Sequence, residues 1–358
     1  MRKWNFCAGP AVISEEVLKE VQSEILEFNE SGMSVMEMSH RSDIYSKVAF
    51  DAKKDLINLL RVPNEYDVLF LQGGATHQFS MIPMNYKHMS DTADYVTTGS
   101  WSAKAFDEAS KIFNPNEIFR SDENVCTKAP NLEELELSKN ATYLHYCPNE
   151  TIQGVAIHEI PKVDIPLIAD MSSVILSQPL DVNKFSIIYA GAQKNIGPAG
   201  LTIVIINKEF MHTGNENLPN ILKYSEHSKS NSMLNTPPTF SWYLAGKVFK
   251  WMIKLGGLDY FEEQNKLKAS LLYDFIDNSD FYINPVDTSC RSIMNVPFML
   301  ENSMLEKKFI SEASDNGFLN LKGHRLVGGM RASIYNAMPL EGVKELIKFM
   351  DYFKSENG

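Results

Sequence analysis

The chain has 358 residues, and 44% of them are hydrophobic. This length is enough for one large domain with a buried core and a second, smaller domain. Its 34 basic and 45 acidic residues give a formal net charge of -11, and we find no dense run of lysine and arginine. These features argue against a general nucleic-acid-binding or anionic-membrane surface, so an anionic ligand would have to be held by a few individually placed cations.

The four cysteines are widely spaced and form no CxxC pair or metal-ligand cluster; they are Cys7, Cys126, Cys147 and Cys290. We therefore expect reduced, mostly buried thiols and no metal site. No run approaches the roughly 18 apolar residues that a membrane span requires, and the first residues contain no long apolar segment of the kind found in secretory signals. The sequence predicts a cytoplasmic protein without internal repeats.

The first 60 residues predict an extended arm followed by two helices. The arm covers 5–13. Ser14 is expected to cap a helix whose apolar residues recur at helical spacing as far as Phe28, and Gly32 is expected to end it. A second helix is expected over 44–60 and is closed by a proline.

From residue 67 to 206 the pattern changes to short apolar strands alternating with helices. Strands are expected at 67–71, 93–98, 142–147, 165–169, 186–190 and 201–206. A helix that Pro83 limits follows the first strand, and a helix running to Ile112 follows the second. This alternation predicts a mostly parallel sheet covered on both faces. The connection 191–200 is too short for a crossover helix, so the last strand should run antiparallel and the sheet should be mixed.

The C-terminal third predicts a change of domain. A long amphipathic helix is expected over 239–255, and it should stop at Gly256-Gly257. Further helices are expected near 261–276, 305–316 and 340–353, and strands near 292–300 and 328–335. The expected organisation is a large α/β domain, 14–256, and a smaller α+β domain formed by 1–13 and 257–358.

Lys194 lies in the middle of a glycine-rich loop between two apolar strands. A lysine removed from solvent there can lose its proton and become able to form a Schiff base. Asp170 ends the preceding strand, at the edge where ligands of open α/β sheets gather, so the two side chains can lie on opposite sides of one flat ligand. Pyridoxal 5'-phosphate (PLP) needs such a lysine for its aldehyde and such a carboxylate for its ring nitrogen. The alternatives are a solvated loop lysine and an aspartate that caps a turn.

Three further stretches fit the same ligand. The turn at Gly73-Gly74 can bring backbone N–H groups and a helix N-terminus close to a phosphate. Trp101 can stack on a planar ring, and Thr151 can donate a hydrogen bond near that ring. The plainer alternatives are an ordinary strand-to-helix turn and a tryptophan packed in the core.

The cations that merit inspection form two groups. His40 and Arg41 stand in a polar loop, whereas His324 and Arg325 precede a glycine pair and Arg331. Arginine suits a bidentate grip on carboxylate or phosphate, and histidine adds a donor. Each residue alone can be a surface charge, but together, in an acidic chain, they favour anion binding.

Six motifs, in chain order, resemble the phosphoserine aminotransferase family of fold type I PLP-dependent transferases. They are NFCAGPA, GMSVMEMSHRS, HYCPNETIQG, AGAQKNIGPAGLTIVI, NTPPTFSWYL and KGHRLVGGMRASIYNAM. The resemblance implies transamination between L-glutamate and 3-phosphohydroxypyruvate, which gives O-phospho-L-serine and 2-oxoglutarate in serine biosynthesis. It leaves open whether 4-phosphohydroxy-L-threonine of vitamin B6 (pyridoxine) biosynthesis is also a substrate.

The resemblance also implies roles around the cofactor ring. Lys194 would form the Schiff base with the aldehyde, and Asp170 would pair with the pyridine nitrogen. Trp101 would stack on the ring, and Thr151 and Gln193 would hydrogen-bond the cofactor. Lys194 and Asp170 are the residues expected to be catalytic.

The cofactor phosphate would be shared between two subunits. Ala75 and Thr76 of one subunit would hold it, and Asn235 and Thr236 would reach it from the other. The resemblance thus implies a homodimer with active sites at the interface. Many family members carry an arginine at the position of Thr76, so the substrate binding assigned to that arginine does not transfer to this chain.

For the substrate, the resemblance implies that Arg331 binds the α-carboxylate. His40 and Arg41, with His324 and Arg325 from the partner chain, would bind the distal phosphate or carboxylate. The alternatives are another fold type I transferase, such as a serine–glyoxylate-type aminotransferase or a cysteine desulfurase, and a non-catalytic anion-binding protein. A desulfurase needs a mobile catalytic cysteine, and nothing in the sequence marks one.

Overall fold

A seven-stranded sheet organises the larger part of the molecule in the computed structural model, which describes residues 2–90, 92–121 and 126–358. In spatial order its strands are β2 (Tyr66–Leu71), β10 (Thr202–Asn207), β9 (Ile187–Gly191), β8 (Leu167–Asp170), β5 (Leu144–Tyr146), β3 (Asp94–Thr97) and β4 (Asn116–Arg120). Strand β10 runs antiparallel to both of its neighbours, and the remaining pairs are parallel. The predicted mixed, mostly parallel sheet is confirmed.

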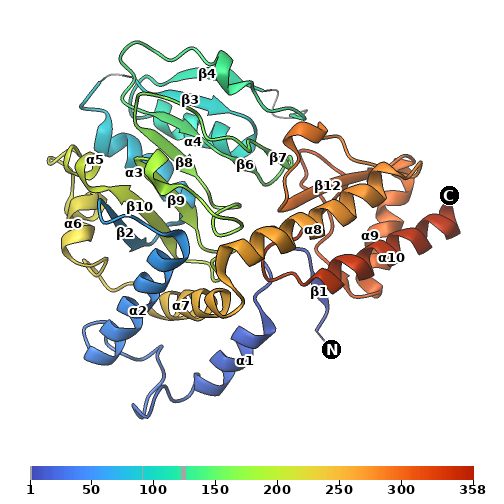
Figure 1. The fold of residues 1–358 in the computed structure, drawn as a ribbon, viewed down its shortest axis with the longest axis horizontal. Helices are drawn as coiled ribbons and strands as arrows, with labels where there is room; N and C mark the ends of the chain where they lie inside the picture. The colour runs from blue at the N-terminus through green and yellow to red at the C-terminus, as the bar shows by residue number, and fades with distance from the viewer. Residues whose placement is uncertain (1, 91, 122–125) are drawn as a thin grey trace.

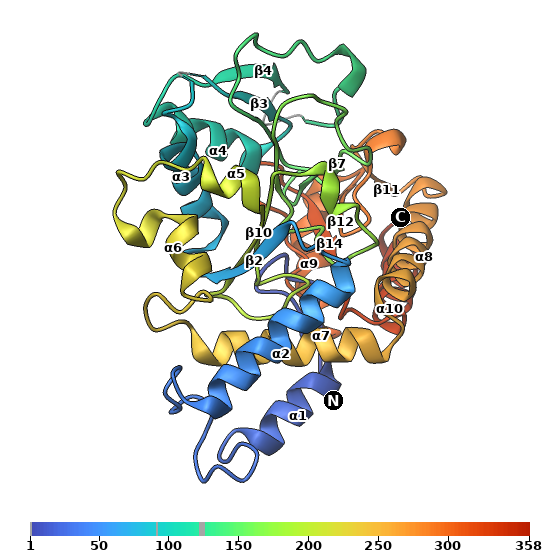
Figure 2. The same cartoon turned by 60° about the vertical axis from the view of Figure 1, so that its left-hand side comes forward.

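Helices cover both faces of this sheet (Figure 1). Among them are α2 (Asp43–Leu60), α3 (Gly74–Tyr86), α4 (Ser100–Ser110) and α7 (Thr239–Lys254), which share hydrophobic cores with the sheet. Ile188 belongs to the core shared with α2 and α7, whereas the next residue, Tyr189, belongs to the core shared with α3 and α4. Successive strand side chains point to opposite faces, so a sheet covered on both sides is apolar throughout. Figure 2 shows that α2 crosses α7 on the face of the sheet that both helices cover.

The C-terminal part has its own sheet and its own core. Its elements are α8 (Gly257–Asp277), β11 (Tyr282–Ile283), β12 (Asn295–Leu300), α9 (Glu306–Asp315), β13 (Phe318–Leu319), β14 (Met330–Ser333) and α10 (Leu340–Asn357). The N-terminal strand β1 (Trp4–Asn5) pairs with β13, and Phe6 lies in the C-terminal core. These contacts support our proposal that 1–13 and 257–358 form the small domain and 14–256 the large one.

The remaining elements are short. They are α1 (Glu15–Glu24), β6 (Asn149–Glu150), β7 (Val155–Ala156), α5 (Lys208–His212), α6 (Tyr224–Lys229) and the 3₁₀ turns Leu132–Glu134, Val182–Lys184, Asn220–Leu222, Thr288–Cys290 and Ser303–Leu305. The sequence does not predict β4, because this edge strand is polar and only partly buried. Within the described ranges, no helix combines the length and the apolar character needed to cross a bilayer.

Several helix ends differ from the prediction: α8 begins at Gly257 rather than near 261, α10 continues to Asn357 rather than 353, and α1 and α3 differ as follows. Helix α1 ends at Glu24, and it cannot continue to Gly32 because Asn29 and Glu30 adopt left-handed conformations with φ of 53° and 57°. Phe28 therefore packs from a loop, with its ring edge-on to Tyr243 at a centroid distance of 5.5 Å.

Helix α3 passes Pro83 and ends at Tyr86. The fixed φ of proline is compatible with a helix, and its missing N–H removes one hydrogen bond only. The last turn is held by tertiary packing, because the Tyr86 ring stacks on Phe210 at 4.2 Å between centroids. Such packing is not visible in a local sequence pattern.

Candidate active site

The candidate site lies where β8 and β9 end side by side. Asp170, the last residue of β8, pairs with Tyr189 of β9. Ser172 Oγ accepts a hydrogen bond from Gly191 N at 3.0 Å and so connects the two strand ends. Lys194 follows three residues after Gly191. The carboxyl ends of these two parallel strands therefore bring Asp170 and Lys194 to the same edge, as predicted from the order of the strands.

Lys194 is almost fully buried, with 7% of its surface exposed. Its Nζ donates a hydrogen bond to Thr151 Oγ1 at 2.6 Å. Burial lowers the pKa of the lysine to about 8, although the nearby Asp170 carboxylate acts in the opposite direction. The solvated loop lysine considered from the sequence is wrong, since this amine is removed from water and partly neutral near neutral pH.

Asp170 is also buried, with 4% of its surface exposed. Its Oδ1 accepts hydrogen bonds from Ser172 N at 2.9 Å and from Ser172 Oγ at 2.5 Å. Burial raises the pKa of this carboxyl, while the Ser172 donors and Lys194 favour its ionised form. In the described part of the chain no hydrogen bond goes to Oδ2, so this oxygen is available to a ligand.

Trp101 lies in the first turn of α4, beside the lysine. Lys194 Nζ is 5.8 Å from the centre of the indole ring, and Lys104 Nζ is 4.4 Å from it. The indole Nε1 is buried and has no hydrogen-bond partner among the described residues. The ring is therefore placed to contact a group bound at Lys194, as well as packing on the core.

Arg331 reaches the same place from β14 of the C-terminal part. Its Nη1 donates to the Thr151 carbonyl oxygen at 3.3 Å. Its Nε is buried without a hydrogen-bond partner in the described ranges, and burial lowers the pKa of the guanidinium. A buried guanidinium with an unused donor is suited to a carboxylate ligand.

The glycine turn before α3 has the backbone that the sequence predicts. Gly73 and Gly74 have φ of 91° and 67°, a region that favours glycine, and Ala75 and Thr76 form the first turn of the helix. A Cβ at Gly73 would lie 2.6 Å from the Cβ of His77. Gly73 is thus packed against His77, whereas a Cβ at Gly74 would meet nothing within 4 Å, so the backbone at Gly74 is open to the close approach of a ligand.

Asn235 and Thr236 lie beside this turn within their own chain. Gln72 Nε2 donates to the Thr236 carbonyl oxygen at 3.1 Å, and Asn235 lines a cavity of about 110 Å³ together with Gln72 and His77. Both residues are exposed. Their contact with the phosphate of a partner subunit remains a prediction.

Gln193 connects the lysine loop to the N-terminal arm. Its carbonyl oxygen accepts a hydrogen bond from Ala11 N at 2.8 Å. A Cβ at Gly9 would contact Gln193 Cγ at 3.4 Å and Lys194 Cε at 3.8 Å. The arm predicted to belong to the small domain thus lies against the loop that carries Lys194.

The four distal cations fall in two places. His324 is half-buried in the loop before β14, and its pKa is lowered by burial and by the charges of Arg331, Arg325 and Lys104. His40 and Arg41 lie in the loop before α2, where Arg41 Nε contacts His40 Nε2 at 3.4 Å. In the described ranges the hydrogen bonds of this second pair are local, so within one protomer they are not joined to the cluster around Lys194.

Sequence reasoning missed Ser172, Lys104 and Glu150. Ser172 follows Asp170 by two residues, the spacing at which an aspartate side chain commonly accepts a hydrogen bond from the backbone N–H. Lys104 follows Trp101 by three residues, so both lie on one face of α4. Both spacings are visible in the sequence, whereas the buried contacts of Glu150 are not.

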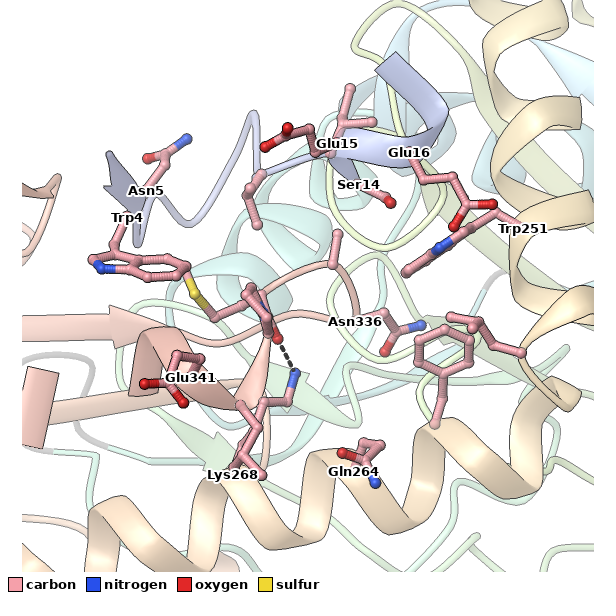
Figure 3. A pocket seen from close by; sticks show the side chains of 18 of the residues that line it. Trp4, Asn5, Ser14, Glu15, Glu16, Trp251, Gln264, Lys268, Asn336 and Glu341 are labelled. Carbon is pink, nitrogen blue, oxygen red and sulfur yellow. Dashed lines mark hydrogen bonds between the residues drawn. The ribbon is translucent and has the colours of Figure 1, made fainter. Parts of the chain in front are cut away.

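A larger cavity of about 600 Å³ lies elsewhere, between the N-terminal arm, the junction of α7 and α8, and the start of α10 (Figure 3). Trp4, Trp251 and Lys268 contribute to its lining, and none of the predicted site residues does. Lys268 Nζ donates to the carbonyl oxygens of Ile334, Tyr335 and Met338 at 2.8–3.0 Å. This lysine therefore has a structural role, and the cavity is not the candidate active site.

Comparison with known proteins gives one consistent result. The family described as aminotransferase class-V matches residues 3–346. Phosphoserine aminotransferase of Acinetobacter baylyi is 53% identical over 361 residues, which cover 100% of both chains. The solved phosphoserine aminotransferase of Bacillus circulans subsp. alkalophilus is 46% identical with a TM-score of 0.97, covering 100% of this chain and 99% of its own.

A PLP-bound phosphoserine aminotransferase from Trichomonas vaginalis is 39% identical, with a TM-score of 0.94 and coverage of 98% of this chain and 100% of its own. The matches extend over nearly the whole chain, across the large and small parts of the fold alike. The chain therefore belongs to the class-V aminotransferases and, within them, to the phosphoserine aminotransferases.

Proposed function

We propose that this chain transfers an amino group between L-glutamate and 3-phosphohydroxypyruvate, giving O-phospho-L-serine and 2-oxoglutarate, with PLP as cofactor. The observation that carries the proposal is the buried amine of Lys194, which lies beside Asp170, Thr151 and Trp101 in a chain whose close relatives are phosphoserine aminotransferases. The reaction is a step of serine biosynthesis, and we place it in the cytoplasm.

The residues present fit PLP. Asp170 Oδ2 is available to accept a hydrogen bond from the ring nitrogen, and the indole of Trp101 offers a flat face beside Lys194. The N–H groups of Ala75 and Thr76, in the first turn of α3, have no intrahelical acceptor and suit a phosphate. When bound, PLP supplies an aldehyde that attaches the substrate nitrogen and a ring that withdraws electrons from the substrate α-carbon.

Lys194 is the group that moves the substrate proton. A pKa of about 8 leaves roughly one amine in ten neutral at pH 7, against fewer than about one in a thousand for an ordinary lysine. The neutral amine can take the proton from the substrate α-carbon and later return it. Thr151 Oγ1 accepts a hydrogen bond from the amine at 2.6 Å. Asp170 is buried away from water, and the charge of its carboxylate therefore acts more strongly on nearby groups.

Arg331 and the distal cations bind the two ends of the substrate. The unused Nε of Arg331 and its position beside Thr151 suit the α-carboxylate that glutamate and phosphoserine share. His324 and Arg325 lie in the loop before β14 and suit a distal carboxylate or phosphate. One set of cations can accept both anions, which explains how one pocket serves two substrates.

The proposed enzyme is a homodimer whose partner supplies Asn235 and Thr236 to the cofactor phosphate, and His324 and Arg325 to join His40 and Arg41 at the distal anion of the substrate. The segment around His40 and Arg41 carries several exposed apolar side chains, namely Leu26, Met33, Met36, Ile44 and Phe50. Leu26 is 86% and Phe50 66% exposed. A group of exposed apolar residues of this kind is typical of an interaction surface, and a second copy of the chain would cover it while bringing its cations to the site.

Absorption spectroscopy tests the function. The purified protein reconstituted with PLP should show a visible band that glutamate bleaches and 3-phosphohydroxypyruvate restores. The Lys194→Ala variant should purify without this band. A colourless reconstituted protein, or a band that glutamate leaves unchanged, would contradict the proposal. Rates measured side by side with 3-phosphohydroxypyruvate and the keto acid of 4-phosphohydroxy-L-threonine show which of them is the better substrate.

A further inference from the structure

Glu150 is a buried carboxylate to which the mechanism above gives no role. It ends β6, and its relative exposure is 0%. Its Oε2 accepts a hydrogen bond from Trp101 N at 3.0 Å, and its Oε1 accepts from Ser102 N at 2.8 Å and from Ser102 Oγ at 2.6 Å. All three donors belong to the first turn of α4, the turn that carries the indole beside Lys194.

These bonds satisfy donors that the helix leaves open. The first N–H groups of an α-helix have no intrahelical acceptor, and the N-cap of α4 is Gly99, which has no side chain to accept from them. Glu150 supplies the acceptor from a distant part of the sequence. Its negative charge is also favourable at the N-terminal end of the helix dipole.

The contact leaves no room for another N-cap residue. A Cβ at Gly99 would lie 2.7 Å from Glu150 Cδ and 2.8 Å from Gln153 Oε1. Gln153, in the same turn as Glu150, donates from Nε2 to Ser100 Oγ at 2.8 Å. The turn between β6 and β7 is thus packed directly on the backbone of the first turn of α4.

The same turn holds the catalytic lysine. Thr151, the residue after Glu150, accepts the hydrogen bond from Lys194 Nζ at 2.6 Å. Two consecutive residues therefore fix two parts of the site: Glu150 fixes the backbone of Trp101, and Thr151 fixes the amine of Lys194. The 5.8 Å between that amine and the indole centre is set through this one turn.

We infer that Glu150 is a positioning residue, which holds Trp101 at the distance from Lys194 at which the indole can stack on the bound cofactor ring. This inference rests on the proposed function, because the cofactor is what the positioned indole contacts. Glu150 acts through Trp101, because both of its carboxylate oxygens already accept hydrogen bonds from the first turn of α4. An acid that only capped α4 would stabilise the fold without changing how the indole meets the cofactor.

The test is a double-mutant cycle on PLP affinity, measured by titrating the cofactor-free protein with PLP and following the visible band. Glu150→Gln replaces one acceptor by an NH₂ group that faces backbone donors. It should weaken PLP binding by about tenfold or more, the fold-change expected for one lost hydrogen bond to a charged group. In a Trp101→Ala background the same substitution should have no further effect, because the group through which Glu150 acts is absent.

Two variants serve as controls. Glu159→Gln makes the same chemical change at an exposed position of the same segment and should leave PLP affinity unchanged. Ser102→Ala removes one of the three hydrogen bonds to Glu150, together with the bonds that Ser102 Oγ accepts from Thr98 N and Gly99 N, and it should also weaken PLP binding. It also tests the inference if Glu150→Gln does not fold, which far-ultraviolet circular dichroism would show.

The outcomes separate the inference from the proposed function. Failure of the wild-type protein to form the band would overturn the function. A wild-type band with unchanged PLP affinity in Glu150→Gln, or with equal losses in the presence and absence of Trp101, would overturn the positioning role alone. If Glu150→Gln does not fold, an unchanged PLP affinity in Ser102→Ala would also overturn the positioning role.

Discussion

The buried amine of Lys194 predicts that the catalytic lysine lowers the stability of the cofactor-free protein. Burial lowers its pKa from 10.5 to about 8, and one unit of pKa shift corresponds to about 1.36 kcal/mol. The shift of about 2.5 units therefore costs the folded state about 3 kcal/mol at pH 7. Replacing Lys194 by methionine, which has similar length and no charge, should remove this cost.

The sign follows from proton binding. Between pH 8 and pH 10.5 the unfolded chain keeps a proton on this lysine that the folded chain has lost, so the stability of the wild type rises with pH relative to the variant. The lost hydrogen bond to Thr151 offsets about 1 kcal/mol of the gain. We expect Lys194→Met to be about 2 kcal/mol more stable than the wild type at pH 7, with the difference falling to about zero or below at pH 10.

Urea unfolding of both proteins, freed of cofactor by dialysis and measured from pH 7 to pH 10, checks this expectation. Lys307→Met, which makes the same chemical change at an exposed position of α9, is the matched control. The reasoning is refuted if the difference between Lys194→Met and the wild type is the same at every pH. The pKa of Lys194 would then be that of an ordinary lysine, and another explanation would be needed for its action as a general base.

Three further predictions concern the site and its support. Arg331→Ala should raise the KM of both glutamate and O-phosphoserine by about 10- to 100-fold, because a hydrogen bond to a charged group is lost. An effect on one substrate alone would show that Arg331 does not bind the α-carboxylate that the two substrates share. Asp170→Asn should keep the fold, because the amide oxygen can still accept from Ser172, and should lower kcat by roughly 10- to 1000-fold in steady-state assays; near-normal turnover would argue against a ring-nitrogen partner. Lys268→Ala should cost about 3 kcal/mol or more in urea unfolding, because three buried carbonyls lose their donor, whereas Lys266→Ala on the exposed face of α8 should cost about 0.5 kcal/mol or less.

Six of the seven strands of the large sheet could be predicted, because each of the six is a short apolar run bounded by turns. The antiparallel direction of β10 also follows from the sequence, because the loop around Lys194 is too short to return the chain to the other end of the sheet. Edge strand β4 and the extension of α3 past Pro83 could not be predicted in this way. Both are held by contacts with distant residues and leave no periodic signal.

The sequence by itself determined the chemistry that the chain can offer: an amine at Lys194, a carboxylate at Asp170 and a glycine turn before α3. It also placed the first two at neighbouring strand ends, because consecutive strands of such a sheet commonly pair. What only the tertiary structure decided is their state. Burial lowers the pKa of the lysine to about 8 and so makes it partly neutral, and Glu150 and Arg331 reach Trp101 and Thr151 from elements far apart in the chain. Desolvation and convergence depend on which elements pack together, and no local pattern of residues records that.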